Sequence, residues 1–232
     1  MTYKIKFDNF FSYSFSLDCL IFGYREGKIY VLLIKRDIEP FLGEWAIPGD
    51  LIYPEEDLPD AANRILTELT SVKEVELHQG LTYGKPERHP QGRVITCAYF
   101  ALVQMDQINA KASSWAKEVK WAPICDVGPL AFDHNMILES TYEILKQKMK
   151  REPICFDLLP EKFALNDMQQ LYEYAFEVEM DKANFRKKIK PIPLVNLHEK
   201  QLNVKHRPAN LFKFDLETYK TMVKEDNFTF KM

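Results

Sequence analysis

The 232-residue sequence lacks several features that mark particular classes of protein. No apolar run approaches the roughly 20 residues that a membrane-spanning helix needs. Charged residues within the first eight positions interrupt the apolar core that a signal peptide requires. We therefore expect a cytoplasmic protein without membrane segments. Glycine is scarce, at 8 residues, whereas apolar residues make up 46% of the chain, so the composition favours packed cores over disorder.

Cysteine is also sparse, and its spacing excludes the common zinc patterns. Cys19, Cys97, Cys125 and Cys155 are far apart and form no Cys-x-x-Cys pair or Cys/His cluster. We interpret them as free thiols in a reducing compartment rather than as disulfides or metal ligands, and we predict no cofactor. The net charge of −3 neither favours nor excludes a nucleic-acid partner.

Strand and helix patterns alternate over the first part of the chain. The strand candidates are the β-rich or apolar runs at 14–21, 29–35, 94–103 and 117–121. Apolar residues at helical spacing predict a helix over 58–69, with Asp57 placed to cap it. A second helix is predicted from about 133 to 149. Together these patterns predict helices around a mixed sheet in a domain of residues 1–150.

The pattern changes at Arg151-Glu152-Pro153, because proline disfavours helix in the residue before it. We place a domain boundary there, with the second domain at 151–232. Its elements are predicted helices at 165–176 and 181–190, followed by β-like runs at 194–198 and 209–214. Two helices followed by a hairpin is the order of a winged helix-turn-helix.

Positive charge is concentrated in this second domain. Residues 151–180 hold 2 Lys/Arg against 7 Asp/Glu, whereas residues 181–213 hold 9 Lys/Arg against 2 Asp/Glu. A winged helix needs positive charge on its second helix and on its wing loop, which contact the DNA grooves and phosphates. The candidate DNA-binding residues are Lys182, Asn184, Arg186, Lys187, Lys188, Lys190, Lys205, His206 and Arg207.

Within that set, Asn184 and Arg186 are the expected base readers, because amide and guanidinium groups make bidentate contacts to adenine and guanine. The lysines are expected on phosphates. Two other interpretations stay open, namely an ordinary solvated charged face and a surface that docks an acidic protein partner.

Residues 48–72 resemble the Nudix box, in which a glycine loop and a helix carry an arginine and several glutamates. Glu56, Arg64, Leu66, Glu68 and Val72 fall on the expected positions without a gap. The departures are equally specific: Asp50 and Ser71 replace the two glycines, and Ile65 and Leu69 replace two of the glutamates.

In an active Nudix hydrolase, these glutamates gather Mg²⁺ around a diphosphate. Magnesium requires oxygen ligands, which Ile65 and Leu69 do not supply. We therefore predict that hydrolysis is lost and that the chain is not an enzyme. Glu56, Arg64 and Glu68 are expected to survive as a salt-bridged support for the loop. A Nudix hydrolase of a nucleotide or sugar diphosphate is the alternative.

A degenerate Nudix domain followed by a winged helix resembles the Nudix-related transcriptional regulators. Segments that carry this resemblance include 130–134, 156–160, 171–173, 181–188 and 207–209. The resemblance implies an α+β fold, with a Nudix-like α/β/α sandwich around a mixed sheet followed by a winged helix. It also implies a homodimer on a palindromic double-stranded DNA operator, controlled by a small effector bound in the Nudix domain.

The resemblance also bears on the identity of the effector. The chain looks most similar to an arabinose-responsive branch of the family found in Bacteroidetes, which implies L-arabinose; an ADP-ribose-sensing regulator of NAD metabolism is the alternative. Because they flank the Nudix cleft in the resembling fold, Asp18, Arg36, Trp45 and Asp50 are the candidate effector-binding residues. The stretch 83–93 carries several cations, but we interpret it as a solvated loop.

Overall fold

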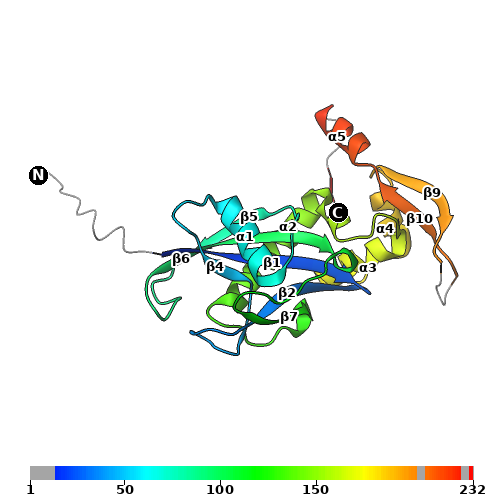
Figure 1. Cartoon of the computed structure of the whole chain (residues 1–232). Coiled ribbons are helices and arrows are strands. Elements are labelled where there is room, and N and C mark those ends of the chain that lie inside the picture. The colour runs from blue at the N-terminus through cyan, green and yellow to red at the C-terminus, as the bar shows by residue number, and fades with distance from the viewer. Residues whose placement is uncertain (1–13, 203–206, 226–229, 232) are drawn as a thin grey trace, which may run out of the picture. The chain divides into compact units, whose positions relative to one another are not determined.

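The computed structural model describes residues 14–202, 207–225 and 230–231 (Figure 1). These residues divide into two compact units. Among the described residues, the first contains 14–21, 31–101 and 108–141, and the second contains 22–30, 102–107 and those from Tyr142 onward. Two short inner segments thus group with the C-terminal part in this division. None of the described helices is long and apolar enough to cross a membrane.

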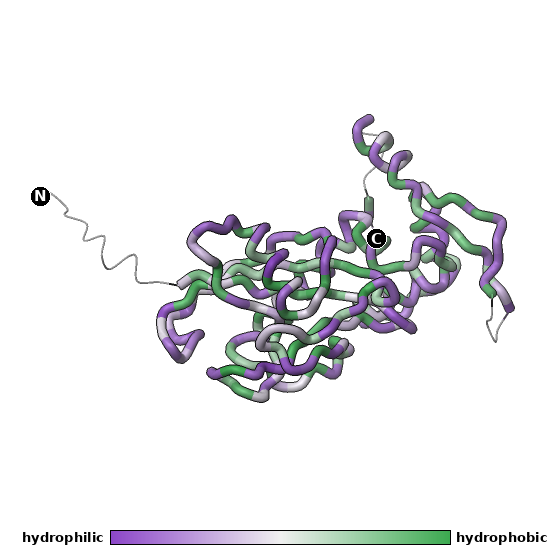
Figure 2. Tube along the Cα trace, viewed as in Figure 1, coloured by the Kyte–Doolittle hydropathy of each residue, from purple (hydrophilic) through white to green (hydrophobic). Residues whose placement is uncertain are grey.

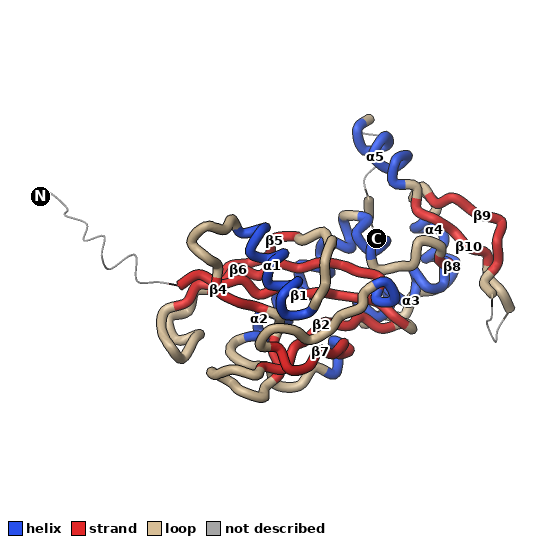
Figure 3. The backbone as a smooth tube through the Cα atoms, viewed as in Figure 1, coloured by secondary structure: helices blue, strands red, loops and turns tan. Residues whose placement is uncertain are grey.

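A mixed sheet forms the framework of the first unit (Figure 3). Its strands are β1 (Ser14–Arg25), β2 (Lys28–Arg36), β3 (Trp45–Ala46), β4 (Gly49–Leu51), β5 (His78–Tyr83), β6 (Val94–Gln104) and β7 (Ala116–Pro123). The order is β3-β2-β1-β6-β5, with β4 paired to β1 and β7 paired to β2. The sequence predicted the four longest of these strands, but it missed β3, β4 and β5.

The long strands form the hydrophobic core. β1 is buried continuously from Leu17 to Phe22, and β6 is buried from Thr96 to Val103. Such runs without alternation are typical of strands covered on both faces. In Figure 2 these strands are coloured as apolar along the middle of the sheet. A charged side chain on these strands must therefore be paired with another group inside the protein.

Helix α1 (Leu58–Thr70) confirms the helix predicted from the Nudix-like segment. The Asp57 side chain caps it by accepting a hydrogen bond from the Leu58 N–H at 2.7 Å. Its buried face includes Ile65 and Leu69, which are 0% and 1% exposed. Ile65 and Leu69, at two positions where the Nudix pattern has glutamates, are thus part of the hydrophobic core.

The second unit contains a winged helix. Its elements are α3 (Leu165–Phe176), α4 (Lys182–Ile189), β8 (Phe163–Ala164), β9 (Leu194–Lys200), β10 (Asn210–Phe214) and α5 (Leu216–Lys224). The three strands pair antiparallel in the order β8-β10-β9. The two helices and the hairpin confirm the predicted winged-helix order, whereas the sequence had not indicated β8 or α5. The longer α2 (His134–Arg151) precedes them.

Partly buried polar groups fix the turn between α3 and α4. The Glu173 carboxylate accepts hydrogen bonds from Gln169 Nε2 at 2.8 Å and from the Met180 N–H at 2.9 Å. Gln169, which is 7% exposed, also donates to the Met180 carbonyl at 2.7 Å. Both backbone groups of Met180 are therefore satisfied, and this fixes the point at which α4 begins.

We expect Glu173→Ala to lower the free energy of unfolding by about 1–3 kcal/mol, because the Met180 N–H and the Gln169 amide lose a charged acceptor. Chemical denaturation measures this loss. The matched control is Glu179→Ala, since Glu179 is exposed on the same turn. Equal stability of the two variants would show that the Glu173 bonds do not hold the turn.

Candidate functional site

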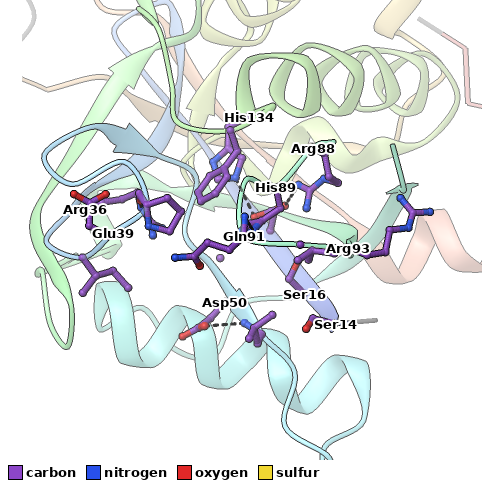
Figure 4. Close-up of a pocket in the computed structure, with 18 of the residues that line it drawn as sticks. Ser14, Ser16, Arg36, Glu39, Asp50, Arg88, His89, Gln91, Arg93 and His134 are labelled. Atoms are coloured by element: carbon purple, nitrogen blue, oxygen red, sulfur yellow. Dashed lines mark hydrogen bonds and ion pairs between the residues drawn. The ribbon is translucent and has the colours of Figure 1, made fainter. Parts of the chain in front are cut away.

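A cavity of about 420 Å³ opens in the first unit beside β1, β4 and the start of α2 (Figure 4). Its lining mixes hydroxyl, amide, carboxylate, guanidinium and aromatic groups. The polar and aromatic members are Ser14, Ser16, Asp18, Arg36, Glu39, Asp50, Arg88, His89, Gln91, Arg93, Trp115, Phe132 and His134. The volume lies in the range of small-molecule sites.

A buried ion network forms the floor of this cavity. Asp18, which is 5% exposed, lies 3.5 Å from Arg88 Nη2 and accepts a hydrogen bond from Thr96 Oγ1 at 2.8 Å. Arg88 also donates two bonds to Asp133, at 3.0 and 2.8 Å. This bidentate geometry is the strong form of an arginine–carboxylate pair. The network connects β1, β6, the β5–β6 loop and the residue before α2.

His134 joins the network in one defined tautomer. The Ile47 N–H donates to His134 Nδ1 at 3.0 Å, so Nδ1 carries no proton. The proton therefore lies on Nε2, which faces Asp18 Oδ1 at 3.3 Å. The imidazole thus bridges the residue after β3 to the carboxylate on β1.

The network keeps Asp18 ionised. Burial is the largest influence on this carboxyl and acts to raise its pKa, but His134, Arg88 and Thr96 together outweigh it, so the pKa is lowered from 3.8. For His89 on the cavity wall, burial and the neighbouring cations of Arg88 and Arg36 lower the pKa from 6.5. His89 is therefore neutral at neutral pH.

Close approach of β4 to Asp18 requires a glycine. A Cβ on Gly49 would lie 2.2 Å from Asp18 Oδ1 and 2.8 Å from the Leu17 carbonyl oxygen. Because β4 pairs with β1 at this point, with Asp18 opposite Gly49, the neighbouring backbone has no room to yield. Gly49 thus allows a charged side chain to be enclosed between two paired strands.

Arg36 is held by aromatic rings on the other side of the cavity. Its Cζ atom lies 4.9 Å from the ring centroids of both Trp115 and Phe132, and its Nε donates to the Pro40 carbonyl at 2.8 Å. Burial is the main cause that lowers the pKa of this guanidinium, opposed by Asp50, Asp18 and Glu39. Arginine stays protonated despite such a shift.

Three of the four predicted effector residues meet in this cavity: Asp18, Arg36 and Asp50. Trp45 is not among the lining residues; its ring instead packs under Lys120 Nζ at 3.9 Å. The tryptophan on the cavity wall is Trp115, whose Nε1 donates to Asp50 Oδ2 at 3.3 Å. Trp45, which we had expected beside the effector, thus lies outside the lining of this cavity.

Sequence reasoning also missed the ion network. The stretch 83–93 was interpreted as a solvated loop, yet the side chain of Arg88 is only 3% exposed. Asp133 and His134 had been noted only as a helix start. An arginine that pairs with carboxylates more than 40 positions away leaves no local pattern in the sequence.

The Nudix-like residues form the predicted loop support. Arg64 contacts Glu56 at 2.5 Å and Glu68 at 3.2 Å, donates to the Leu51 carbonyl at 2.8 Å, and lies over the Tyr53 ring. Glu56 and Glu68, the two glutamates at expected Nudix-box positions, therefore neutralise one arginine. Within the described part of the chain, no group of three or more His, Cys, Asp or Glu side chains is arranged to hold a metal ion.

A second candidate site is the outer face of α4. Phe185 and Ile189 are buried, so the remaining positions of this short helix point to solvent. The exposed polar residues are Lys182, Asn184, Arg186, Lys187 and Lys188, followed by Lys190 at the C-cap. The Asp181 side chain caps the helix by accepting from the Asn184 N–H at 2.9 Å.

These cations differ from other lysines of the second unit. Lys162 pairs with Glu199, Lys213 with Glu161, and Lys220 with Glu217. By contrast, no ion pair with another described residue involves the lysines and Arg186 of α4. The predicted wing residues Lys205 and His206 lie outside the described residues, whereas Arg207 lies within them.

Comparison with known families and structures finds matches for both parts of the chain. The NUDIX domain model matches residues 15–142, and the NrtR DNA-binding winged helix domain model matches residues 155–214. The ADPR responsive transcriptional repressor NtrR of Acinetobacter baylyi is 30% identical over 211 residues, which cover 88% of this chain and 83% of that protein. The chain belongs to the NrtR family.

Solved NrtR structures are also similar to this chain in fold. NrtR of Shewanella oneidensis complexed with a 27mer DNA has a TM-score of 0.73 and 29% identity, with 89% of this chain and 95% of that chain covered. The NUDIX domain of the same Shewanella protein complexed with ADP ribose has a TM-score of 0.54 and 30% identity, with 61% of this chain and 99% of that chain covered. The α+β fold, a Nudix domain followed by an NrtR-type winged helix, is thereby confirmed.

We expect Gly49→Ala to destabilise this NrtR-family protein by about 1–3 kcal/mol, because the added methyl group overlaps Asp18 and the β1 backbone. Thermal or chemical unfolding measures the change. Gly128→Ala is the matched control, since nothing lies within 4 Å of a Cβ at that position. A Gly49→Ala protein as stable as the control would contradict the close packing of β4 on Asp18.

We expect Asp18→Asn to lower the free energy of unfolding by about 1–3 kcal/mol at neutral pH, because Arg88 loses one of its two carboxylate partners. The folded pKa of Asp18 lies below 3.8, so the wild-type advantage is present above that pH and disappears as pH falls through the folded pKa. Denaturation midpoints at several pH values measure this. Asp126→Asn, at an exposed position, is the control. If the stability difference between the wild type and Asp18→Asn did not change with pH, ionisation of Asp18 would not be its source.

Proposed function

We propose that this chain is a transcriptional repressor that binds double-stranded operator DNA through α4 and the β9–β10 wing and is released by a small effector. The observation that carries the proposal is the exposed cationic face of α4, whose charges lack carboxylate partners within the described structure. Partnerless surface cations are available to neutralise phosphates, and the released counterions favour binding.

The recognition helix also presents groups that read bases. Asn184 and Arg186 are exposed on α4, beside the lysines. An amide pairs with adenine and a guanidinium with guanine in the major groove. Lys182, Lys187, Lys188 and Lys190 are assigned to phosphates. Two copies of the chain would place their recognition helices on half-sites about one DNA turn apart, roughly 34 Å, so we propose a homodimer on a palindromic operator.

For the effector, we propose an ADP-ribose-like sugar nucleotide bound in the Asp18 cavity. The support is the Acinetobacter baylyi relative, whose name describes it as ADPR responsive, and the Shewanella oneidensis NUDIX domain complexed with ADP ribose. The L-arabinose prediction has no support from these relatives, and it is replaced by this proposal. Arabinose remains useful as a comparison ligand.

Helix α2 is the proposed connection between effector and DNA. It begins at His134, a lining residue of the cavity, and its second half lies in the second unit. There the Tyr172 hydroxyl donates to the Met149 carbonyl at 2.9 Å, which fastens α2 to α3. A ligand that shifts the start of α2 would alter the preferred position of the winged helices. The free energy by which the ligand weakens DNA binding then equals the difference between its binding free energies for the two conformational states.

Hydrolysis of the effector is not part of the proposal. Glu56 and Glu68 already neutralise Arg64, and the positions of two further Nudix-box glutamates hold buried Ile65 and Leu69. A chain that binds a sugar nucleotide without cleaving it is suited to sensing its concentration. Incubation with ADP-ribose and Mg²⁺, followed by measurement of released AMP, tests this directly.

We expect Arg186→Ala and Lys187→Ala each to weaken operator binding about tenfold or more, because each removes a direct DNA contact. The DNA is an operator selected by the wild-type chain from a random pool, and fluorescence anisotropy measures the Kd. Lys187→Ala should weaken all sequences uniformly and reduce the salt slope by about one phosphate contact. Arg186→Ala should also relax sequence preference.

Lys73→Ala is the matched control, because Lys73 is an exposed lysine of the first unit. If both α4 variants bind the operator as tightly as this control, the winged helix does not read DNA through α4. Binding that depends on salt but not on sequence would instead support docking of an acidic partner.

A further inference from the structure

The cavity holds a balanced set of charges whose cations are already engaged. Arg88 is bound to Asp133 and Asp18, Arg36 lies between Trp115 and Phe132, and Arg93 donates to the Gly84 carbonyl. A diphosphate group needs cations that converge on it and are not held by carboxylates. Arg88, at the floor of the cavity, is already bound to two carboxylates, so the inner part beside Asp18 does not offer its charge to a phosphate.

Hydrogen-bond acceptors remain available there instead. An ionised carboxylate offers about four acceptor positions. Asp50 accepts only from the Leu51 N–H at 2.7 Å and from Trp115 Nε1 at 3.3 Å, and Asp18 Oδ1 accepts only from His134 among the bonds seen in the described structure. Ser14, Ser16 and Gln91 add groups that both donate and accept, and they line the same cavity (Figure 4).

We propose that the inner cavity is a subsite for the hydroxyl groups of a neutral sugar ring, with Asp50 and Asp18 as the acceptors. In an ADP-ribose-like ligand this ring is the terminal ribose, and the diphosphate lies toward the open side of the cavity. The inference rests on the proposed effector, and it adds that the terminal sugar, rather than the diphosphate, determines specificity.

The physical reason is the direction of the available hydrogen bonds. A sugar hydroxyl donates to a carboxylate without adding charge, and bonds to charged acceptors are stronger than neutral ones. A phosphate in the same place would meet the ionised Asp18 and Asp50, and like charges at close range oppose binding. A site that holds buried acceptors also discriminates strongly against ligands that lack the matching donor.

The experiment is calorimetric titration of the full chain with ADP-ribose and with ADP, which lacks the terminal ribose. We expect ADP-ribose to bind at least about tenfold more tightly than ADP. Asp50→Asn should weaken ADP-ribose about tenfold while leaving ADP within about twofold, because only the terminal sugar contacts this carboxylate. Asp126→Asn is the control variant, and D-ribose and L-arabinose are titrated in parallel.

The outcomes separate the subsite from the proposed effector. Equal affinity for ADP-ribose and ADP, with no effect of Asp50→Asn, overturns the sugar subsite but leaves nucleotide sensing intact. If ADP-ribose fails to bind, the proposed effector is wrong, and the titrations with free pentoses then test the sugar subsite by themselves. A pentose whose binding is weakened by Asp50→Asn supports the sugar subsite. Absence of binding by every sugar tested overturns it.

Discussion

The enclosed carboxylate of Asp18 is the constraint on which the cavity depends. A buried charge is costly unless it is paired, and here Arg88, His134 and Thr96 together hold it ionised. Each partner comes from a different element, so β1, β6, the β5–β6 loop and the start of α2 are fixed relative to one charge. Gly49 completes the enclosure because no larger residue fits beside that carboxylate. The cavity is therefore preorganised, and a ligand need not assemble it.

The two candidate sites use positive charge in opposite ways. Inside the cavity, the guanidiniums of Arg36 and Arg88 are held by aromatic rings or carboxylates, so they position the walls. On α4, the lysines and Arg186 are exposed and form no ion pair with other described residues. The first arrangement suits recognition of a neutral, hydroxyl-rich group, and the second suits a polyanion whose counterions are released on binding. Helix α2 connects the two units along the chain, because it starts at the cavity and continues into the second unit.

Local patterns in the sequence were sufficient to predict most of the helices and the long strands. Asp57 and the apolar spacing of 58–69 predicted α1, and the order of two helices and a hairpin predicted the winged helix. The short strand β5 was missed because its burial alternates weakly and its register is set by pairing with β6. The cavity was less predictable: Arg88 is buried only because distant carboxylates neutralise it, and the choice between Trp45 and Trp115 depends on side-chain direction. Contacts between residues far apart in the sequence determine the burial of Arg88 and the choice of tryptophan, and no local sequence pattern indicates either.

The proposed function requires that the effector cavity and the DNA-binding face are thermodynamically coupled. The Kd for the selected operator, measured by anisotropy with and without saturating ADP-ribose and in the absence of Mg²⁺, tests this coupling. Allosteric coupling of about 1–3 kcal/mol corresponds to a change of roughly 5–150-fold, and we expect DNA binding to weaken within that range. An unchanged Kd, under conditions where calorimetry shows the effector bound, would show that the two sites are not coupled.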